Sequence, residues 1–141
     1  MMETLLIKNA LLYDGLGGEP YHGSLLVEGD RLAAVGEVPS GEFDKVIYAG
    51  GRVACPGFID LHRHCDFAAL TPGFGSIELA QGITTALCGP CGMGAFPSPE
   101  DPDTCRRYED SLRPCLGSLP DERRFDSLPS WGRAVETAGL P

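Results

Sequence analysis

The sequence predicts an α/β fold in which a β-rich N-terminal part precedes strands that alternate with helices. Residues 4–54 consist of short apolar runs separated by glycine-rich turns, a pattern typical of β-strands. Further along the chain, two strand-like apolar runs at 57–61 and 83–87 alternate with segments of helical composition. Because that alternation is typical of parallel strands joined by helices, we divide the chain into residues 1–55 and 56–141.

The N-terminal part is expected to consist of short paired strands, opening with an apolar run at residues 5–13. The runs at 24–27 and 31–35 flank a Glu-Gly-Asp turn, so we predict that they pair as an antiparallel hairpin. The runs at 45–49 and 52–54 flank a Gly-Gly turn, and we predict a second hairpin there.

Three helices are predicted in the C-terminal part. Residues 77–81 suit a short helix with Ser76 as its N-cap and Gly82 after its last residue. A second helix is predicted within residues 104–112. The third covers residues 127–138, where a proline near the start and a glycine just past the end mark the boundaries.

Composition indicates a globular chain and argues against some classes of function. The hydrophobic content of 43% is ordinary for a packed domain. No apolar run reaches the roughly 18 residues of a membrane span, and the N-terminus lacks the basic segment of a secretory signal. A net charge of −9 argues against nucleic acid, whose phosphates require lysine and arginine. We therefore expect a cytoplasmic protein with no nucleic-acid partner and no membrane partner.

The six cysteines are expected to be reduced thiols, because cytosolic conditions keep them so. Cys55 and Cys88 lie in apolar strands and are predicted to be small buried residues. Cys105 and Cys115 fall in a polar segment and have no predicted role. Cys65 follows a histidine and, if the strand continues, points to the opposite face from it.

The run Pro56–His64 is the most informative segment, because it is an apolar strand that ends in a His-x-His pair. Residues i and i+2 of a strand share a face about 7 Å apart, so His62 and His64 can reach one metal ion. Asp60 lies on the same face and either supports this site or orders water there. Asp66 is either a substrate or metal contact or an ordinary loop carboxylate.

A second signal is the run Ile83–Leu87, which is predicted to be a buried strand that leads into a glycine-rich loop containing Cys88 and Cys91. In a parallel sheet, both strand ends would meet at one edge, so potential ligands from both loops would meet there. The Cys88-x-x-Cys91 spacing also matches a redox motif, which gives the alternative of a small non-enzymatic binding or redox module.

These segments resemble a known family. Pro56–His64 resembles the first barrel strand of the metal-dependent amidohydrolase superfamily. Residues 80–85, followed by Gly-Pro-Cys-Gly at 89–92, resemble the second-strand signature of its N-acyl-D-amino-acid deacylase (D-aminoacylase) branch. That branch usually carries Gly-Asn-Cys-Gly, so the asparagine is replaced here and the cysteine is kept. The resemblance covers roughly residues 4–97.

The resemblance implies a small β-sandwich domain joined to a TIM-type (β/α)8 barrel. Residues 1–55 would be the N-terminal portion of the sandwich, and residues 56–141 the first βα units of the barrel. Such a barrel needs about 250 residues, and the chain has 141. We therefore expect an N-terminal fragment that is inactive alone, with the catalytic general base and further histidine ligands in the part that is absent.

The resemblance also implies the chemistry. Zinc would be held tightly by Cys91 with histidines from later strands, and His62 and His64 would border a second, weaker metal position. The parent protein would hydrolyse the amide bond of N-acyl amino acids, with the D configuration expected. Dihydroorotase-like and hydantoinase-like enzymes, which act on cyclic amides, are an alternative that Cys91 disfavours. The expected partner is this small substrate, and the sequence does not indicate an oligomeric state.

Overall fold

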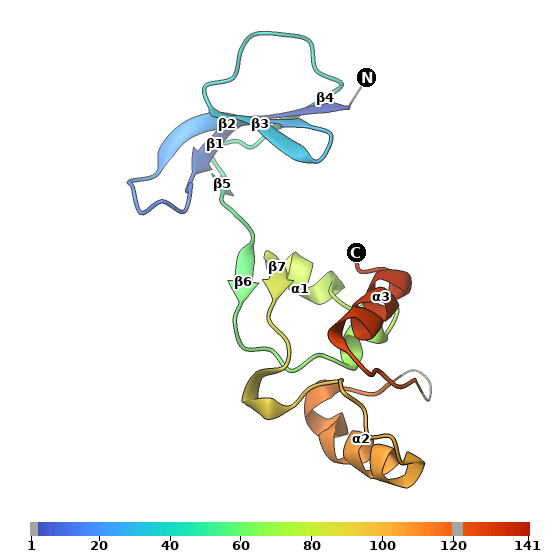
Figure 1. The fold of residues 1–141 in the computed structure, drawn as a ribbon. Coiled ribbons are helices and arrows are strands. Elements are labelled where there is room, and N and C mark those ends of the chain that lie inside the picture. The colour runs from blue at the N-terminus through green and yellow to red at the C-terminus, as the bar shows by residue number, and fades with distance from the viewer. Residues whose placement is uncertain (1–2, 120–122) are drawn as a thin grey trace. The chain divides into compact units, whose positions relative to one another are not determined.

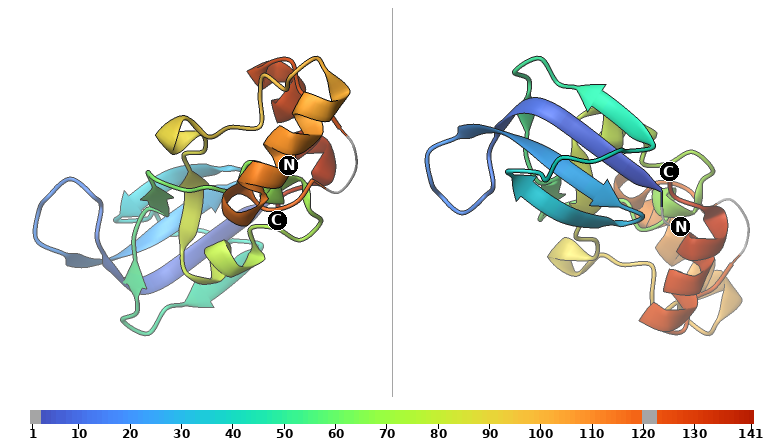
Figure 2. Two further views of the ribbon diagram at one scale, coloured as in Figure 1. Left: turned by 90° about the horizontal axis from the view of Figure 1, so that it is seen from below. Right: turned by 90° about the horizontal axis from the view of Figure 1, so that it is seen from above.

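The computed structural model describes residues 3–119 and 123–141, which divide into two compact units between Pro56 and Gly57 (Figure 1). Two further views show that strands make up the first unit and that the helices belong to the second (Figure 2). Within these described residues, none of the helices has the length and apolar character needed to cross a membrane.

The first unit is one five-stranded sheet with the order β3-β2-β1-β4, in which β5 also pairs with β1. Its strands are β1 (Thr4–Leu12), β2 (Tyr21–Glu28), β3 (Arg31–Gly36), β4 (Lys45–Tyr48) and β5 (Val53–Ala54). β2 and β3 pair antiparallel, which confirms the first predicted hairpin. The buried side chains of this sheet are Leu6, Ala10, Leu12 and Leu26.

The predicted second hairpin is wrong, because β4 and β5 both pair in parallel with β1 and not with each other. The register of β1 is interrupted between Ile7 and Ala10, where Asn9 adopts a positive φ of 54°. Gly51 donates its backbone N–H to the Asn9 carbonyl over 2.7 Å. The Gly-Gly segment therefore follows β1 past its irregularity, and it does not turn the chain back on itself as a hairpin would. Cys55, predicted to be buried, is exposed at the end of this unit.

The second unit begins with two neighbouring parallel strands, β6 (Phe58–Asp60) and β7 (Ile83–Ala86), as predicted. Between them lie the short 3₁₀ helix η1 (Ala68–Leu70) and the helix α1 (Ser76–Ala80). Gly57 lets β6 approach β7, since a side chain at this position would overlap Thr84. Ser76 is the first residue of α1 and not its N-cap; that position belongs to Gly75, at a positive φ of 96°.

The prediction that β7 is buried is wrong for the described residues. Thr84, Thr85 and Ala86 are exposed, and so are Phe58 and Ile59 of β6. An apolar run predicts burial only where other layers cover the sheet, and the described residues do not cover these two strands. The fold is therefore a mixed α/β arrangement with one parallel strand pair.

A hydrophobic cluster holds the helical part of the second unit together. Helices α2 (Pro102–Leu116) and α3 (Leu128–Ala138) lie where helices were predicted, although α2 is longer at both ends. The buried members of the cluster are Phe67, Leu70, Ala95, Leu116 and Phe125, and Trp131 and Val135 of α3 pack against them. Cys105, which had no predicted role, is buried on α2, where its thiol lies 3.2 Å from Glu109 Oε1.

The start of α2 is fixed by Asp101, whose side chain accepts a 2.8 Å hydrogen bond from the Thr104 backbone N–H. Hydrogen bonds from the side chain and backbone of Thr104 lower the pKa of the Asp101 carboxyl below its ordinary value. This capping residue precedes Thr104, the predicted start, so the helix begins earlier than predicted.

Leu116→Ala tests the cluster. Leu116 is fully buried, so its truncation should lower the free energy of unfolding by about 2–5 kcal/mol. Leu128→Ala is the matched control, because Leu128 is 58% exposed, and its effect should stay within about 0.5 kcal/mol. Urea unfolding followed by the fluorescence of the single tryptophan measures both, and equal losses would contradict the assigned core.

Candidate metal centre

The structure brings together the three residues predicted as metal ligands. His62 and His64 follow β6, and Cys91 lies in the 3₁₀ turn η2 (Pro90–Gly92) after β7. One ligand atom from each residue lies within 4.8 Å of the other two. Cys91 Sγ is 3.4 Å from His62 Nε2, and the two imidazole rings are 5.3 Å apart between centroids.

The two histidines lie beyond the end of β6, which stops at Asp60. Asp60 Oδ1 accepts a 3.1 Å hydrogen bond from the His62 backbone N–H, and its other carboxylate oxygen lies 3.8 Å from the Arg63 guanidinium. Asp60 is therefore placed to hold the turn that carries His62. It is not one of the residues whose ligand atoms converge.

Cys91 reaches the histidines through an unusual backbone conformation. Its φ of 59° lies in the left-handed region, which a residue with a side chain seldom occupies. Gly89 and Gly92 on either side also have positive φ values, of 83° and 70°. Such local strain persists when surrounding structure enforces it, and it gathers at functional sites.

The donor set fits a borderline-soft divalent cation. Imidazole and thiolate are both ligands that zinc prefers. Nδ1 of His64 is buried and has no hydrogen-bond partner among the described residues. An unsatisfied buried polar atom costs about 1–3 kcal/mol, and a cation or a further polar group would remove that cost. His62 and Cys91 are exposed, so an ion can reach them.

Asp66 connects the two ligand-bearing loops. It is 2% exposed, and its Oδ2 accepts a 3.4 Å hydrogen bond from the Gly89 backbone N–H. Its own carbonyl accepts a 2.9 Å bond from Trp131 Nε1. Of the two predicted possibilities, this geometry favours a structural carboxylate, because Asp66 is not part of the converging set.

The sequence analysis missed two contacts beside this centre. The Sγ atoms of Cys65 and Cys88 lie 3.0 Å apart. A hydrogen bond from the Cys88 thiol lowers the pKa of Cys65, and the same contact, with burial, raises the pKa of Cys88. Arg63 forms an ion pair with Glu78 of α1. The Cys65–Cys88 contact joins residues 23 positions apart and the Arg63–Glu78 contact residues 15 apart, so no local pattern indicated them.

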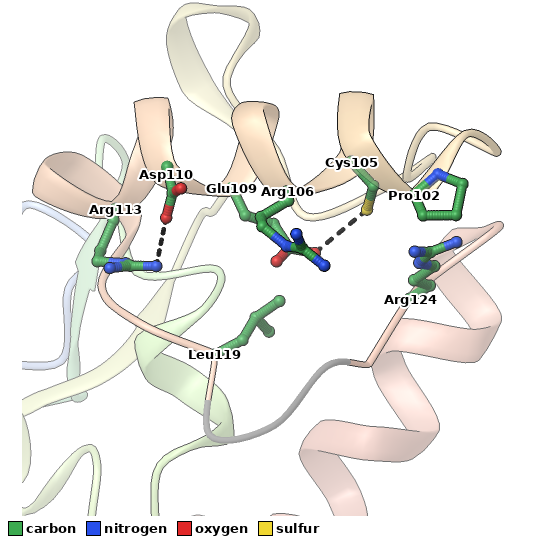
Figure 3. Close-up of a pocket in the computed structure, with 8 residues that line it drawn as sticks. All are labelled: Pro102, Cys105, Arg106, Glu109, Asp110, Arg113, Leu119 and Arg124. Atoms are coloured by element: carbon green, nitrogen blue, oxygen red, sulfur yellow. Dashed lines mark hydrogen bonds and ion pairs between the residues drawn. The ribbon is translucent and has the colours of Figure 1, made fainter.

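A separate cavity of about 370 Å³ lies along α2 and shares no residue with the centre (Figure 3). Among the residues that line it, Arg113 pairs with Asp110 at 2.5 Å, and the Cys105 thiol contacts Glu109. It offers no converging set of ligands, so the His62–His64–Cys91 group is the better candidate for chemistry.

Comparison with known proteins gives partial but consistent matches. No family model matches the chain. N-acyl-D-glutamate deacylase from Alcaligenes xylosoxydans xylosoxydans is 38% identical over 67% of this chain and 20% of its own length. N-acyl-D-aspartate deacylase from the same organism is 35% identical over 92% and 25%, respectively. An adenine deaminase from Edwardsiella ictaluri is 41% identical over 61% of this chain and 15% of its own length.

Two solved structures share the fold. A D-aminoacylase studied for its binuclear metal centre gives a TM-score of 0.62 with 23% identity, over 99% of this chain and 37% of that chain. The N-acyl-D-glutamate deacylase of Bordetella bronchiseptica, complexed with zinc and a phosphonate inhibitor, gives a TM-score of 0.59 with 22% identity. That match covers 97% of this chain and 35% of that chain. The chain thus spans between about a seventh and a quarter of the three curated relatives.

These sequence matches confirm the predicted resemblance to the D-aminoacylase branch of the amidohydrolase superfamily. The two solved structures are similar to this chain in fold.

The burial of the cysteines can be tested by alkylation. Cys91 and Cys115 are exposed, whereas Cys65 and Cys105 are 3% and 2% exposed. Limiting iodoacetamide, followed by peptide mass spectrometry, should label the exposed pair much faster than the buried pair. Urea should remove the difference. Labelling of Cys65 as fast as Cys115 in the absence of urea would contradict the described packing of the loop after β6.

Proposed function

We propose that this sequence forms part of a zinc-dependent hydrolase that cleaves the amide bond of N-acyl-D-amino acids. The observation that carries the proposal is the convergence of His62, His64 and Cys91 at the ends of two adjacent parallel strands. The similarity to N-acyl-D-glutamate and N-acyl-D-aspartate deacylases supports this substrate class.

The proposal extends to architecture. β6 and β7 would be the first two strands of a (β/α)8 barrel, and the N-terminal sheet would be one part of a β-sandwich. Active sites of such barrels lie at the carboxyl ends of the strands, where the ligand residues of this chain lie. The match covers only 20% of the length of the N-acyl-D-glutamate deacylase. We therefore assign the general base and the remaining ligands to a part outside these 141 residues.

Each residue of the centre has a proposed role. Cys91 holds the tighter zinc position, and His62 and His64 border the weaker one. Asp60 orients the backbone that carries His62, and Asp66 holds the loop that leads to Cys91. When bound, zinc at such a site lowers the pKa of a bound water towards 7 and polarises the scissile carbonyl. Proton transfer then requires a base that these residues do not provide.

Three other functions are weaker candidates. Adenine deamination is supported by the 41% identity to the Edwardsiella ictaluri enzyme over 88 residues. A redox module built on Cys88 and Cys91 is disfavoured, because Cys88 contacts Cys65 while Cys91 lies against His62. Hydrolysis of cyclic amides remains the third possibility from the sequence.

Activity should be measured on the complete reading frame that contains this sequence. N-acyl-D-amino acids should be hydrolysed, with the activity lost on chelation and restored by zinc, and L-amino-acid analogues should react poorly. Cys91→Ser should lose activity, and Cys115→Ser is the matched control at an exposed thiol. The 141-residue chain alone should be silent. Turnover of adenine or of cyclic amides, without deacylation, would replace the proposal.

Metal binding to the 141-residue chain tests the ligands independently of turnover. Cobalt(II) should produce a near-ultraviolet charge-transfer absorption from the Cys91 thiolate, with weak affinity because few ligands are present. Cys91→Ser should abolish this band and His62→Ala should weaken it. His22→Ala, an exposed histidine in the other unit, should leave it unchanged. A band that survives Cys91→Ser would remove Cys91 from the ligand set.

A further inference from the structure

Two thiols outside the ligand set lie in direct contact. Cys65 follows His64 in the loop after β6, and Cys88 lies in the loop after β7. Their Sγ atoms are 3.0 Å apart, although 23 residues separate them in sequence. The next residue of each loop is also in contact, since Asp66 accepts a hydrogen bond from Gly89. The two loops are therefore held side by side at two successive positions.

We propose that Cys65 and Cys88 form a reversible disulfide that crosslinks the two loops carrying the candidate ligands. A disulfide needs its sulfur atoms about 2.05 Å apart, so their observed separation has to shorten by only about 1 Å. This modification leaves Cys91 free, because Cys91 lies against His62 and not at the Cys65–Cys88 contact. It does not depend on the proposed hydrolysis.

With hydrogen peroxide as the oxidant, the two steps balance in the same way whichever thiol reacts first. Cys88 is partly exposed and Cys65 is buried, so exposure favours Cys88 as the first to react. The Cys88 sulfur attacks one peroxide oxygen and the O–O bond breaks, giving a sulfenic acid and one water. The Cys65 sulfur then attacks the Cys88 sulfur, and the S–O bond breaks as a second water leaves with the remaining proton. Two electrons pass from the two thiols to peroxide, and a dithiol reverses the bond by exchange.

The crosslink would connect the candidate site to the redox state of its surroundings. Cys65 is adjacent to His64, and Cys88 is three residues before Cys91. A covalent bond between them restricts how far the two ligand-bearing loops can separate. We therefore expect the oxidised chain to resist proteolysis within these loops better than the reduced chain does.

Peptide mapping shows whether Cys65 is linked to the loop after β7. Trypsin cleaves after Arg63 and Glu-C protease after Glu78 and Glu100, so Cys65 falls in peptide 64–78 while Cys88 and Cys91 share peptide 79–100. The reduced 141-residue chain is treated with stoichiometric hydrogen peroxide, alkylated and digested. The expected main product is a linked pair of these peptides that carries one alkyl group, is otherwise two hydrogens lighter than their sum, and is split by dithiothreitol.

Variants distinguish the partner of Cys65. The linked pair should persist in Cys91→Ser and in the exposed control Cys115→Ser, and should disappear in Cys88→Ser. In urea, oxidation should spread over many pairings of the six cysteines. Loss of the link in Cys91→Ser, an internal Cys88–Cys91 disulfide in peptide 79–100, or no preferred pairing without urea would each overturn the proposal.

Discussion

The candidate centre depends on the parallel pairing of β6 with β7. Phe58 donates its backbone N–H to Gly82 at one end, and Leu87 donates to Asp60 at the other, so both strands end at the same edge. His62 and Cys91 are far apart in sequence, and this shared edge is what lets their side chains come within 3.4 Å. Without this pairing, the histidines of the loop after β6 and the cysteines of the loop after β7 would not be brought together.

Polar contacts then hold the two loops in place, and one of them reaches the hydrophobic cluster. Trp131 packs against that cluster and donates its indole N–H to the Asp66 carbonyl. Asp66 in turn accepts from Gly89, close to Cys91. A continuous set of contacts therefore runs from the helical core to the loop after β7. Arg63, paired with Glu78, holds the other side of the first loop against α1.

The nature of the donors narrows the chemistry more than the fold does. A mixed α/β arrangement with one parallel strand pair supports many functions. Two imidazoles and a thiolate around an accessible space favour zinc over harder cations such as magnesium or calcium. The proposed substrate class comes from the deacylase relatives. The adenine deaminase relatives support a second proposal, because this chain covers a small share of each kind of relative.

Sequence alone determined the elements whose signals are local. The Pro-Gly entry to β6, the His-x-His spacing, the Cys-bearing loop and the proline and glycine around α3 all act through neighbouring residues. Tertiary structure decided what depends on distant partners. β4 and β5 add to β1 because that strand offers free backbone groups on one side, which no turn signal reveals. Cys65 meets Cys88 for the same reason: register between β6 and β7 sets which loop residues touch, and a single sequence does not encode register locally.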